Sequence, residues 1–428
     1  MSSAPHASEA ASTTLLPRLL RGVGSQPLTR LHSHVDLHGP LPTPCSREEL
    51  LALVERSGLR GRGGAAFPAA RKLASVASRR GTKVVVVNGV EGEPASKKDR
   101  ALLHQTPHLV LDGAAVAAHA VGTREVYVML SERDHPGRAS LVAALADRAT
   151  LLHDPQFRLL DAPERFITGQ ETALVNVING GPSLPTFGTR PYERGVDRRP
   201  TLVQNAETLA HLALIARHGP EWFRQLGTDS DPGSALLTVS GAVESPGVYE
   251  IEHGTPLAFA LDCAGVIEPL RAVLIGGYFG SWLPAEAVPG TRLSPGALRE
   301  QGASLGAGVI VALGESACPV AEVSRITDWF ADQTAGQCGP CVNGLGAIAD
   351  AFGELADGVA EHGTIARVDS WTRDIVGRGA CQHPDGAARF IRSALQVFAP
   401  EIEDHAARGP CERCEHPPLL QVPAALAA

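Results

Sequence analysis

The residues with the strongest chemical signal are a glycine-rich run at positions 57–68, SGLRGRGGAAFP, which lies between two stretches with helical periodicity. Glycine permits positive φ angles and lets backbone N–H groups approach a phosphate closely. A helix that starts near Phe67 and Pro68 would direct its N-terminal dipole at the same anion. The run therefore predicts a contact with a phosphate or nucleotide. A glycine loop without a ligand is the alternative, and we give it less weight because loops of this composition often carry function.

Part of this run, Gly61-x-Gly63-x-x-Ala66, has the spacing of a dinucleotide-binding fingerprint. That motif must follow a β-strand. The preceding residues, 46–56, instead have the pattern of a capped amphipathic helix. We therefore do not expect an ordinary Rossmann turn at this position.

Further polar groups follow a buried strand. The β-branched run 83–87 predicts a strand, and it ends in the polar turn Asn88-Gly-Val-Glu-Gly-Glu-Pro94. Polar residues at the carboxyl edge of an α/β sheet are typical of a nucleotide site. Two later segments, 166–174 and 200–209, have the pattern of a loop followed by a helix cap. Each of these segments is ambiguous on its own.

Composition restricts the class of protein. The chain has 428 residues, a net charge of −8 and no long run of Lys or Arg, which argues against nucleic acid as a partner. It has no apolar stretch long enough for a membrane span, and residues 15–21 are too short and too charged for a secretory signal. We expect a cytoplasmic protein, which can also be peripheral to a membrane complex. In that compartment its eight cysteines are better candidates for metal ligands than for disulfides.

Five motifs in this order resemble a known family. They are the glycine loop, Asn-x-x-Glu-Gly-Glu-Pro at 88–94, Gly-x-Glu-Thr-Ala-Leu at 169–174, Pro-Thr-Leu-Val-x-Asn-x-Glu-Thr-Leu at 200–209 and Cys-Gly-Pro-Cys at 338–341. Together they look like the NADH-binding flavoprotein subunit of respiratory complex I and its relatives in NAD-linked hydrogenases and formate dehydrogenases. The resemblance covers roughly residues 46–400. It implies FMN, NAD(H) and a [4Fe–4S] cluster as cofactors.

The elements that must position these motifs fall into an α/β fold with additional domains. We expect residues 1–45 to be poorly ordered and residues 46–233, where helices alternate with strands, to form a Rossmann-like FMN- and NADH-binding α/β domain. The pattern strand, strand, helix, strand within 234–312 looks like the small β-grasp module of the family (SLBB-like). Helical periodicity from about Ala321 predicts a helical bundle, so residues 313–428 become an iron–sulfur domain with a C-terminal C-x-x-C tail.

The resemblance also implies roles for individual residues. Residues of the glycine loop would line the phosphates, with Lys72 as a nearby positive charge, and Phe67 would stack on the nicotinamide or adenine. Polar residues beyond the loop would contact the flavin edge, the isoalloxazine ring and the ribityl phosphate. The full set is Gly61, Gly63, Gly64, Ala65, Phe67, Lys72, Asn88, Glu91, Gly169, Glu171, Asn205 and Thr208. Each could instead be a capping or turn residue.

The cysteines suggest a cluster that lacks one ligand. Cys338, Cys341 and Cys381 match the iron–sulfur spacing of the family, but the position three residues before Cys338 is Ala335, where the family has a cysteine. We expect the second C-x-x-C, Cys411 and Cys414, to supply the fourth ligand of a [4Fe–4S] cluster. Two alternatives are a zinc site made by both C-x-x-C pairs and a free or adventitious tail pair. We expect the remaining three, Cys45, Cys263 and Cys318, to be small buried hydrophobic residues.

Other departures from the family pattern lie near the expected flavin. Val90 and Gln170 occupy positions where complex I relatives have acids, and Phe166 replaces a tyrosine. Fewer acids mean less repulsion of a nucleotide phosphate and less opposition to flavin reduction. Cofactor preference and potential can therefore differ from those of complex I.

The function implied by the resemblance is that of an NADH dehydrogenase-like (diaphorase) oxidoreductase subunit. Hydride would pass from the nicotinamide to FMN, and single electrons would pass to the cluster and on to a ferredoxin-like or thioredoxin-like partner subunit. A non-catalytic remnant that acts as a metal-binding or assembly module is the alternative, prompted by Ala335, Val90 and Gln170. NADH against NADPH and the direction of electron flow stay open at this point.

Overall fold

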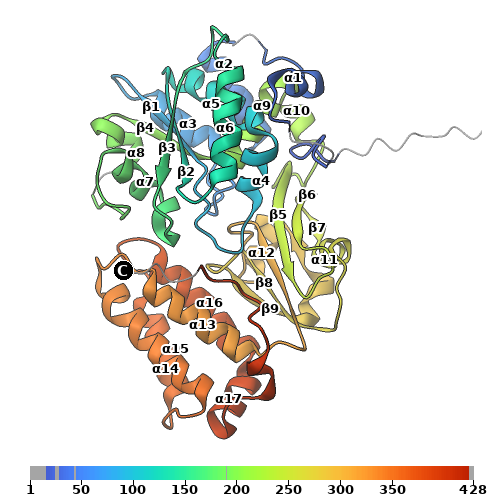
Figure 1. The fold of residues 1–428 in the computed structure, drawn as a ribbon, viewed down its shortest axis with the longest axis vertical. Coiled ribbons are helices and arrows are strands. Elements are labelled where there is room, and N and C mark those ends of the chain that lie inside the picture. Colours follow the sequence, from blue (N-terminus) through green and yellow to red (C-terminus); the bar gives the residue numbers. More distant parts are fainter. Residues whose placement is uncertain (1–15, 25–27, 43–44, 189, 424–428) are drawn as a thin grey trace, which may run out of the picture.

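The computed structural model describes residues 16–24, 28–42, 45–188 and 190–423. Figure 1 shows three parts: an α/β part at the top, a β-sheet part at the lower right and a bundle of helices at the lower left. These parts follow one another along the chain, and the C-terminal segment runs back along the bundle toward the α/β part.

The α/β part is built on a four-stranded parallel sheet in the order β3-β2-β1-β4. Its strands are β1 (Val84–Asn88), β2 (Glu125–Ser131), β3 (Gln156–Ala162) and β4 (Thr201–Asn205). The valines of β1 are fully buried, as expected for a strand that is covered on both faces. The helices are α2 (Arg47–Ser57), α3 (Ala69–Ala77), α4 (Lys98–Gln105), α5 (Pro107–Val121), α6 (His135–Asp147), α7 (Glu171–Ile178), α8 (Pro191–Arg194), α9 (Ala206–His218) and α10 (Pro220–Phe223), with 3₁₀ turns η1 (Phe166–Gly169) and η2 (Val196–Arg198).

Helices α5 and α9 pack against each other more closely than side chains normally allow. Gly113 on α5 faces the backbone of Leu209 on α9, where a Cβ atom on residue 113 would lie 1.8 Å from the Leu209 carbonyl oxygen. Only glycine fits at this contact. The close approach holds α9 firmly, and the N-terminus of α9 supplies part of the candidate site described below.

The second part is a five-stranded mixed sheet in the order β6-β5-β11-β8-β9, with β5 and β11 parallel. The sequence strand, strand, helix, strand that was expected of a β-grasp module is present. The elements are β5 (Ser234–Gly241), β6 (Gly247–Glu252), β7 (Thr255–Pro256), α11 (Leu257–Ala264), β8 (Leu270–Ile275), β9 (Ser281–Pro284), η3 (Ala285–Gly290), β10 (Arg292–Leu293), α12 (Pro295–Glu300) and β11 (Val309–Gly314).

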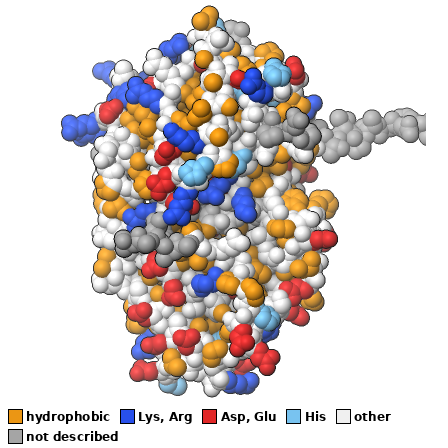
Figure 2. All heavy atoms as spheres, viewed as in Figure 1, with side chains coloured by type: hydrophobic (Ala, Val, Ile, Leu, Met, Phe, Trp, Pro, Cys, Tyr) orange, Lys and Arg blue, Asp and Glu red, His pale blue; other side chains and the backbone are white. Residues whose placement is uncertain are grey.

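The third part is helical. It comprises α13 (Pro319–Asp332), a π-helical turn η4 (Pro340–Leu345), α14 (Gly346–Asp357), α15 (Thr364–Ile375), α16 (His383–Val397), α17 (Ala399–Arg408) and the short 3₁₀ turn η5 (Glu412–Glu415). Its core continues into the second part, because Trp282 of β9 packs on Phe390 and Phe398. Acidic side chains are spread over this lower region of the surface in Figure 2. No helix within the described ranges is long and apolar enough to cross a membrane.

The N-terminal segment is better ordered than expected. Helix α1 (Leu31–His38) lies against the α/β part, and the buried His34 contacts Asp112 of α5 at 2.8 Å. Residues 18–20 donate three backbone N–H bonds to one carboxylate oxygen of Glu250 on β6, at 2.8–3.2 Å. The prediction of poor order for residues 1–45 is therefore wrong for 16–24 and 28–42, because buried polar partners far along the sequence hold them. Residues 1–15, 25–27 and 43–44 lie outside the described residues.

Candidate functional site

The glycine loop folds back on itself between α2 and α3 and is fixed to α9. The Gly61 N–H donates to the Phe67 carbonyl at 2.8 Å, and the Arg62 N–H donates to Thr208 Oγ1 at 2.8 Å. Gly64 has φ +98°, a conformation that side-chain-bearing residues avoid. A helix precedes this loop, so it is not the strand-to-helix turn of a Rossmann motif, as the sequence predicted.

Asn205 caps the helix that anchors this loop. Its side-chain oxygen accepts from the N–H groups of Glu207 and Thr208, at 3.1 and 3.4 Å, and its amide donates to Asp99 at 2.7 Å. Gly63 lies directly over Asn205, since a Cβ on residue 63 would lie 3.4 Å from the Asn205 Cβ. The structure thus brings Gly61, Gly63, Asn205 and Thr208 together, as expected for one site.

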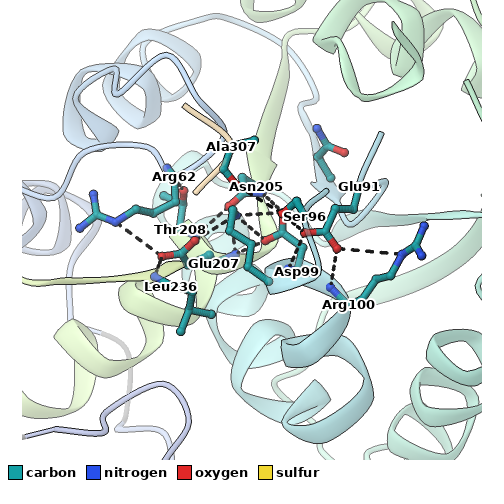
Figure 3. Close-up of polar contacts among 12 residues, drawn as sticks. Arg62, Glu91, Ser96, Asp99, Arg100, Asn205, Glu207, Thr208, Leu236 and Ala307 are labelled. Atoms are coloured by element: carbon teal, nitrogen blue, oxygen red, sulfur yellow. Dashed lines mark hydrogen bonds and ion pairs between the residues drawn. The ribbon is translucent and has the colours of Figure 1, made fainter. Parts of the chain in front are cut away.

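A network of buried charges supports the loop from below (Figure 3). Glu207 pairs with Lys98 at 2.9 Å and with Arg62 at 3.7 Å, and Lys98 also contacts Asp99 at 3.0 Å. Burial alone would lower the pKa of Lys98, but the carboxylates of Asp99 and Glu207 raise it above its ordinary value. Lys98 therefore remains a fixed positive charge.

Glu91 supports the site indirectly. Its carboxylate accepts the N–H groups of Asp99 and Arg100, both at 3.1 Å, and the hydroxyl of Ser96 (Figure 3). These contacts cap the start of α4, and burial together with the nearby Asp99 raises the pKa of Glu91. In the structure Glu91 positions Lys98 and Asp99, in place of the direct flavin contact expected from the sequence.

A cavity of about 390 Å³ opens beside the glycine loop. One wall is Gly61, Gly64 and Ala65, and the opposite wall comes from β5 and residues 302–308 of the second part. Its lining contains four cationic side chains and one carboxylate: Arg62, Lys98, Arg299, Arg389 and Glu207. A cavity with this balance of charge suits an anionic ligand.

The backbone at Gly64 is a cradle that a side chain would fill. A Cβ on residue 64 would contact no protein atom closer than the Gly306 carbonyl oxygen, at 3.7 Å, so it would project toward the open cavity. Bare glycine backbone beside a cationic cavity fits the phosphate and ribityl end of a flavin nucleotide. The residues present therefore fit FMN.

The remaining predicted residues surround the carboxyl end of β1. Asn88 donates from its amide to the Gly169 carbonyl at 2.8 Å. Lys72 of α3 forms an ion pair with Glu171, the first residue of α7. Phe67 is half exposed at the loop, available to a planar ligand. Lys72, Asn88, Gly169 and Glu171 thus lie in contacting pairs, and their direct contacts with cofactor stay predictions.

Gln170 explains how the loss of an acid is accommodated. Its side-chain oxygen accepts from the N–H groups of Thr172 and Ala173, at 2.8 and 3.0 Å, and so caps α7. A neutral amide performs this role without adding a negative charge beside Glu171. Val90, at the other missing acid, is buried in the core under the sheet.

Glu93 links the first two parts of the molecule. Its carboxyl accepts the Tyr278 N–H at 2.9 Å and the Ala95 N–H at 3.3 Å, deep in the interior. Burial, with a smaller contribution from Glu91, raises the pKa of Glu93 to about 7, while the two N–H donors act against this shift. The link is therefore sensitive to pH in the physiological range.

This shift predicts a pH-dependent stability. Between pH 4.5 and about 7, Glu93 stays protonated in the folded state and ionises in the unfolded state, so the free energy of unfolding falls as pH rises. At 1.36 kcal/mol per unit, the shift from 4.5 to about 7 corresponds to about 3 kcal/mol. Chemical denaturation at pH 5 and pH 8 should show that Glu93→Gln loses less stability over this interval than the wild type. Parallel curves for the two proteins would contradict the assignment.

Three cysteines meet at the end of the helical part nearest the α/β part. Cys341 is buried on η4, and Cys338 and Cys381 are half-buried in the adjoining loops. Burial raises the pKa of Cys341 to about 12, and negative charge on Cys338 and Cys381 would raise it further. Three thiols that oppose one another's ionisation suit a multivalent metal group that neutralises them. The donor set fits an iron–sulfur cluster held by three cysteines.

The flavin end and the cluster end share one short element, η1. Its Gly169 contacts Asn88, while Phe166 at its other end donates its N–H to Gln333 at 3.0 Å. Arg165, just before it, bonds to the Thr334 carbonyl at 3.1 Å. The loop that carries Ala335 and Cys338 is therefore tied to the expected flavin pocket.

The tail cysteines are not near these three. Cys411 and Cys414 cluster with Cys318 and His405, whose ligand atoms all lie within 4.8 Å of one another. Cys318 precedes α13 and Cys338 follows it, so the two groups lie at opposite ends of this 14-residue helix, about 20 Å long. The prediction that Cys411 or Cys414 supplies the fourth cluster ligand is therefore wrong. The zinc alternative that paired both C-x-x-C motifs fails for the same reason.

The single cysteines also differ from expectation. Cys45 and Cys263 are exposed, so the prediction that they are buried is wrong. Cys318 is buried as predicted, but its Sγ lies 3.5 Å from His405 Nε2 and belongs to the polar cluster.

Family models match three segments of the chain. Residues 54–214 match the Nuo51 FMN-binding domain, residues 236–275 the SLBB domain, and residues 321–405 the NADH-ubiquinone oxidoreductase-F iron-sulfur binding region. An NADH-quinone oxidoreductase flavoprotein of the F type from Rhizobium meliloti (strain 1021) is 31% identical over 384 residues, which are 85% of this chain and 90% of that protein. The chain belongs to the F-type flavoproteins of the NADH-quinone oxidoreductases. The family named from the five motifs is thereby confirmed.

More distant relatives agree with this assignment. NADH dehydrogenase [ubiquinone] flavoprotein 1, mitochondrial, of Dictyostelium discoideum is 29% identical over 84% of this chain and 79% of that protein. Among solved structures, the H2-reduced NAD+-reducing [NiFe]-hydrogenase has a TM-score of 0.82 and 27% identity, covering 92% of this chain and 67% of the hydrogenase chain. The predicted α/β, SLBB and iron–sulfur arrangement is confirmed, as are FMN and the iron–sulfur cluster as cofactors.

Several residues of the site were not found by sequence reasoning. Arg62, Lys98, Asp99 and Glu207 form the buried network, and Arg299 and Arg389 line the cavity from other parts of the molecule. Lys98 and Asp99 closely follow the turn at 88–94, and Glu207 lies inside the motif at 200–209, so adjacency to a motif was a usable signal. Arg299 and Arg389 gave none.

Proposed function

We propose that this protein oxidises NADH at a bound FMN and passes the electrons singly through its iron–sulfur cluster to a partner protein. The observation that carries the proposal is the bare backbone of Gly64 facing a cationic cavity whose loop is anchored on the Asn205-capped helix. Bound FMN supplies the capacity to accept a hydride and release electrons one at a time. No side chain needs to act as an acid or base in that transfer.

The residues of this chain have three tasks in the proposal. The glycine loop and the fixed charges of Arg62 and Lys98 hold the phosphate end, and the Asn88–Gly169 contact shapes the pocket at the carboxyl end of β1. Phe67, half exposed beside the loop, offers a face for the nicotinamide or adenine. The Lys72–Glu171 pair supplies polar groups at the flavin edge.

We propose that the physical partner is an iron–sulfur subunit with a ferredoxin-like or thioredoxin-like fold. Curated relatives are subunits of NADH-quinone oxidoreductases, and the similar solved structure is an NAD+-reducing hydrogenase. Exposed Val342 and Val376 beside the cluster cysteines support docking at that end of the helical part. We keep a cytoplasmic location as a prediction, on the ground that all eight cysteines are free.

The proposal also includes the limits of the domains. We divide the chain into an FMN- and NADH-binding domain at 46–233, an SLBB-like domain at 234–312 and an iron–sulfur domain from 313. The beginning of β5 at Ser234 and of α13 at Pro319 supports these limits.

The test is the flavin content and anaerobic reduction of purified protein. We expect about one FMN per chain after reconstitution, and bleaching of its visible absorbance by NADH without oxygen. Protein that stays colourless and binds NADH no more tightly than AMP would support the non-catalytic remnant instead.

Ala335 gives a prediction about the cluster. Replacing it with cysteine restores a thiol to the loop whose Thr334 already contacts Cys341. We expect Ala335→Cys to slow the loss of cluster absorbance in air at least about tenfold, because a fourth thiolate protects the fourth iron. Gln337→Cys, in the same loop but outside the family spacing, is the matched control. Equal decay of Ala335→Cys and wild type would show that another group already holds that iron.

A further inference from the structure

We propose that Cys318, His405, Cys411 and Cys414 form a tetrahedral zinc site, separate from the iron–sulfur cluster, that fastens the C-terminal tail to the start of α13. The four residues come from three segments: the N-cap of α13, the helix α17, and the tail around η5. No periodicity or short motif joins them, so the fold alone brings them together.

The distances match ligands of a single ion. Two sulfurs bound to one zinc at about 2.3 Å lie about 3.8 Å apart across a tetrahedral angle. Cys411 Sγ and Cys414 Sγ are 3.8 Å apart. A sulfur and an imidazole nitrogen on one zinc lie about 3.6 Å apart, and His405 Nε2 is 3.5 Å from Cys318 Sγ and 3.9 Å from Cys414 Sγ.

The histidine is already oriented as a ligand. Its Nδ1 lies 3.0 Å from the Ala356 carbonyl oxygen, which can only accept, so Nδ1 carries the proton. The lone pair of Nε2 then faces the sulfurs. A metal-binding histidine is commonly held by such a bond from its other ring nitrogen.

The identity of the ion follows from the donor set and spacing. Three thiolates and one imidazole in a tetrahedron are typical of structural zinc. An iron–sulfur cluster is disfavoured because its cysteines bind different iron atoms and cannot approach as closely as two ligands of one ion. The pair is not a disulfide either, since 3.8 Å greatly exceeds an S–S bond of about 2.05 Å.

Beyond this site the tail depends on further contacts. The N–H groups of Leu419 and Leu420 donate to the carboxylate of Glu322 at 2.7 and 2.9 Å, and Arg325 donates to the Leu420 carbonyl at 2.6 Å. The Tyr278 hydroxyl donates to the Gln421 carbonyl, and the backbone of Tyr278 bonds to Glu93. The ion therefore anchors a strap that runs along the bundle to the junction of the three parts.

X-ray absorption at the zinc edge tests the site in the complete protein, because it ignores iron and flavin. We expect about one zinc per chain, with three sulfurs at about 2.3 Å and one nitrogen at about 2.0–2.1 Å. Less than about a tenth of an equivalent in protein purified with zinc present would overturn the proposal, as would iron bound at these four residues.

Variants test which residues bind. Cys414→Ser and His405→Ala should each lower zinc content at least about tenfold while FMN and cluster iron stay at wild-type levels. Matched controls are Cys263→Ser, which is exposed elsewhere, and His416→Ala, a tail histidine outside the four. Zinc retained at wild-type level in Cys414→Ser, His405→Ala double-variant protein would overturn the assignment.

A proteolysis assay on the wild-type protein avoids dependence on folding of a variant. Removing zinc with a chelator should speed tryptic cleavage after Arg413 at least about tenfold, and added zinc should reverse the effect. Loss of FMN or cluster would leave this cleavage unchanged, so failure here is distinguishable from failure of the proposed electron-transfer function. Unchanged cleavage after zinc removal would overturn the anchoring role.

Discussion

Gly64→Val should abolish FMN retention and with it NADH oxidation. The valine side chain would occupy the cavity beside the glycine loop, since the nearest protein atom to a Cβ at this position is the Gly306 carbonyl oxygen at 3.7 Å. We expect FMN affinity to fall at least about a hundredfold, which corresponds to about 2.8 kcal/mol. Flavin fluorescence titration of the apoprotein measures this loss.

The effect must be separated from backbone strain. Gly64 has φ +98° and Gly81 has φ +85°, so valine at either position carries a similar conformational cost. Gly81 has no atom within 4 Å of the added Cβ and lies away from the cavity. Gly81→Val should therefore lose comparable stability and keep FMN. Equal loss of FMN in both variants would mean that strain, rather than occupied space, causes it.

Cys341→Ser should eliminate the iron–sulfur absorption. Cys341 is the buried member of the three cysteines, so a serine there removes the ligand that is best shielded from solvent. Iron content should fall below about a tenth of the wild-type value. NADH should still bleach the FMN, because the flavin pocket is built from other elements, while single-electron reduction of a ferredoxin-type acceptor should stop.

Two control variants define this result. Cys263→Ser, an exposed cysteine of α11, should keep both iron and acceptor reduction. Cys411→Ser should keep the cluster, because Cys411 lies with Cys318 and His405 at the other end of α13. A Cys411→Ser protein that loses the iron–sulfur absorption would mean that the tail does supply a cluster ligand.

Much of the fold and the flavin site could be predicted because their signals are local. The glycine loop, the strand at 84–88 and the Asn205 cap are each contained in a few consecutive residues, and their order identified the family. The buried role of Glu91 was missed, because the same Glu can contact a ligand or cap a helix and only the backbone of α4 decides between them.

The tail site could not be predicted because its ligands are distant in sequence. Cys318 and His405 are separated by 87 residues, and neither belongs to a recognisable motif. The C-x-x-C at 411–414 is visible in the sequence, but the unfilled ligand position at Ala335 suggests the wrong partner for it. Spacing identifies a pair of ligands, whereas the direction in which the chain returns determines which other residues they meet.

The contact between residues 18–20 and Glu250 has a consequence for how the chain folds during synthesis. These residues leave the ribosome early, yet their acceptor lies 232 positions after Arg18. At about 5–20 residues per second, translation needs roughly 12–46 s to reach it. The N-terminal strap must therefore wait, undocked, while the parallel sheet forms, and its closure over β6 comes late in the folding sequence. A nascent chain stalled before Glu250 should accordingly be cut by protease near its N-terminus, whereas one released beyond the β-grasp part should resist.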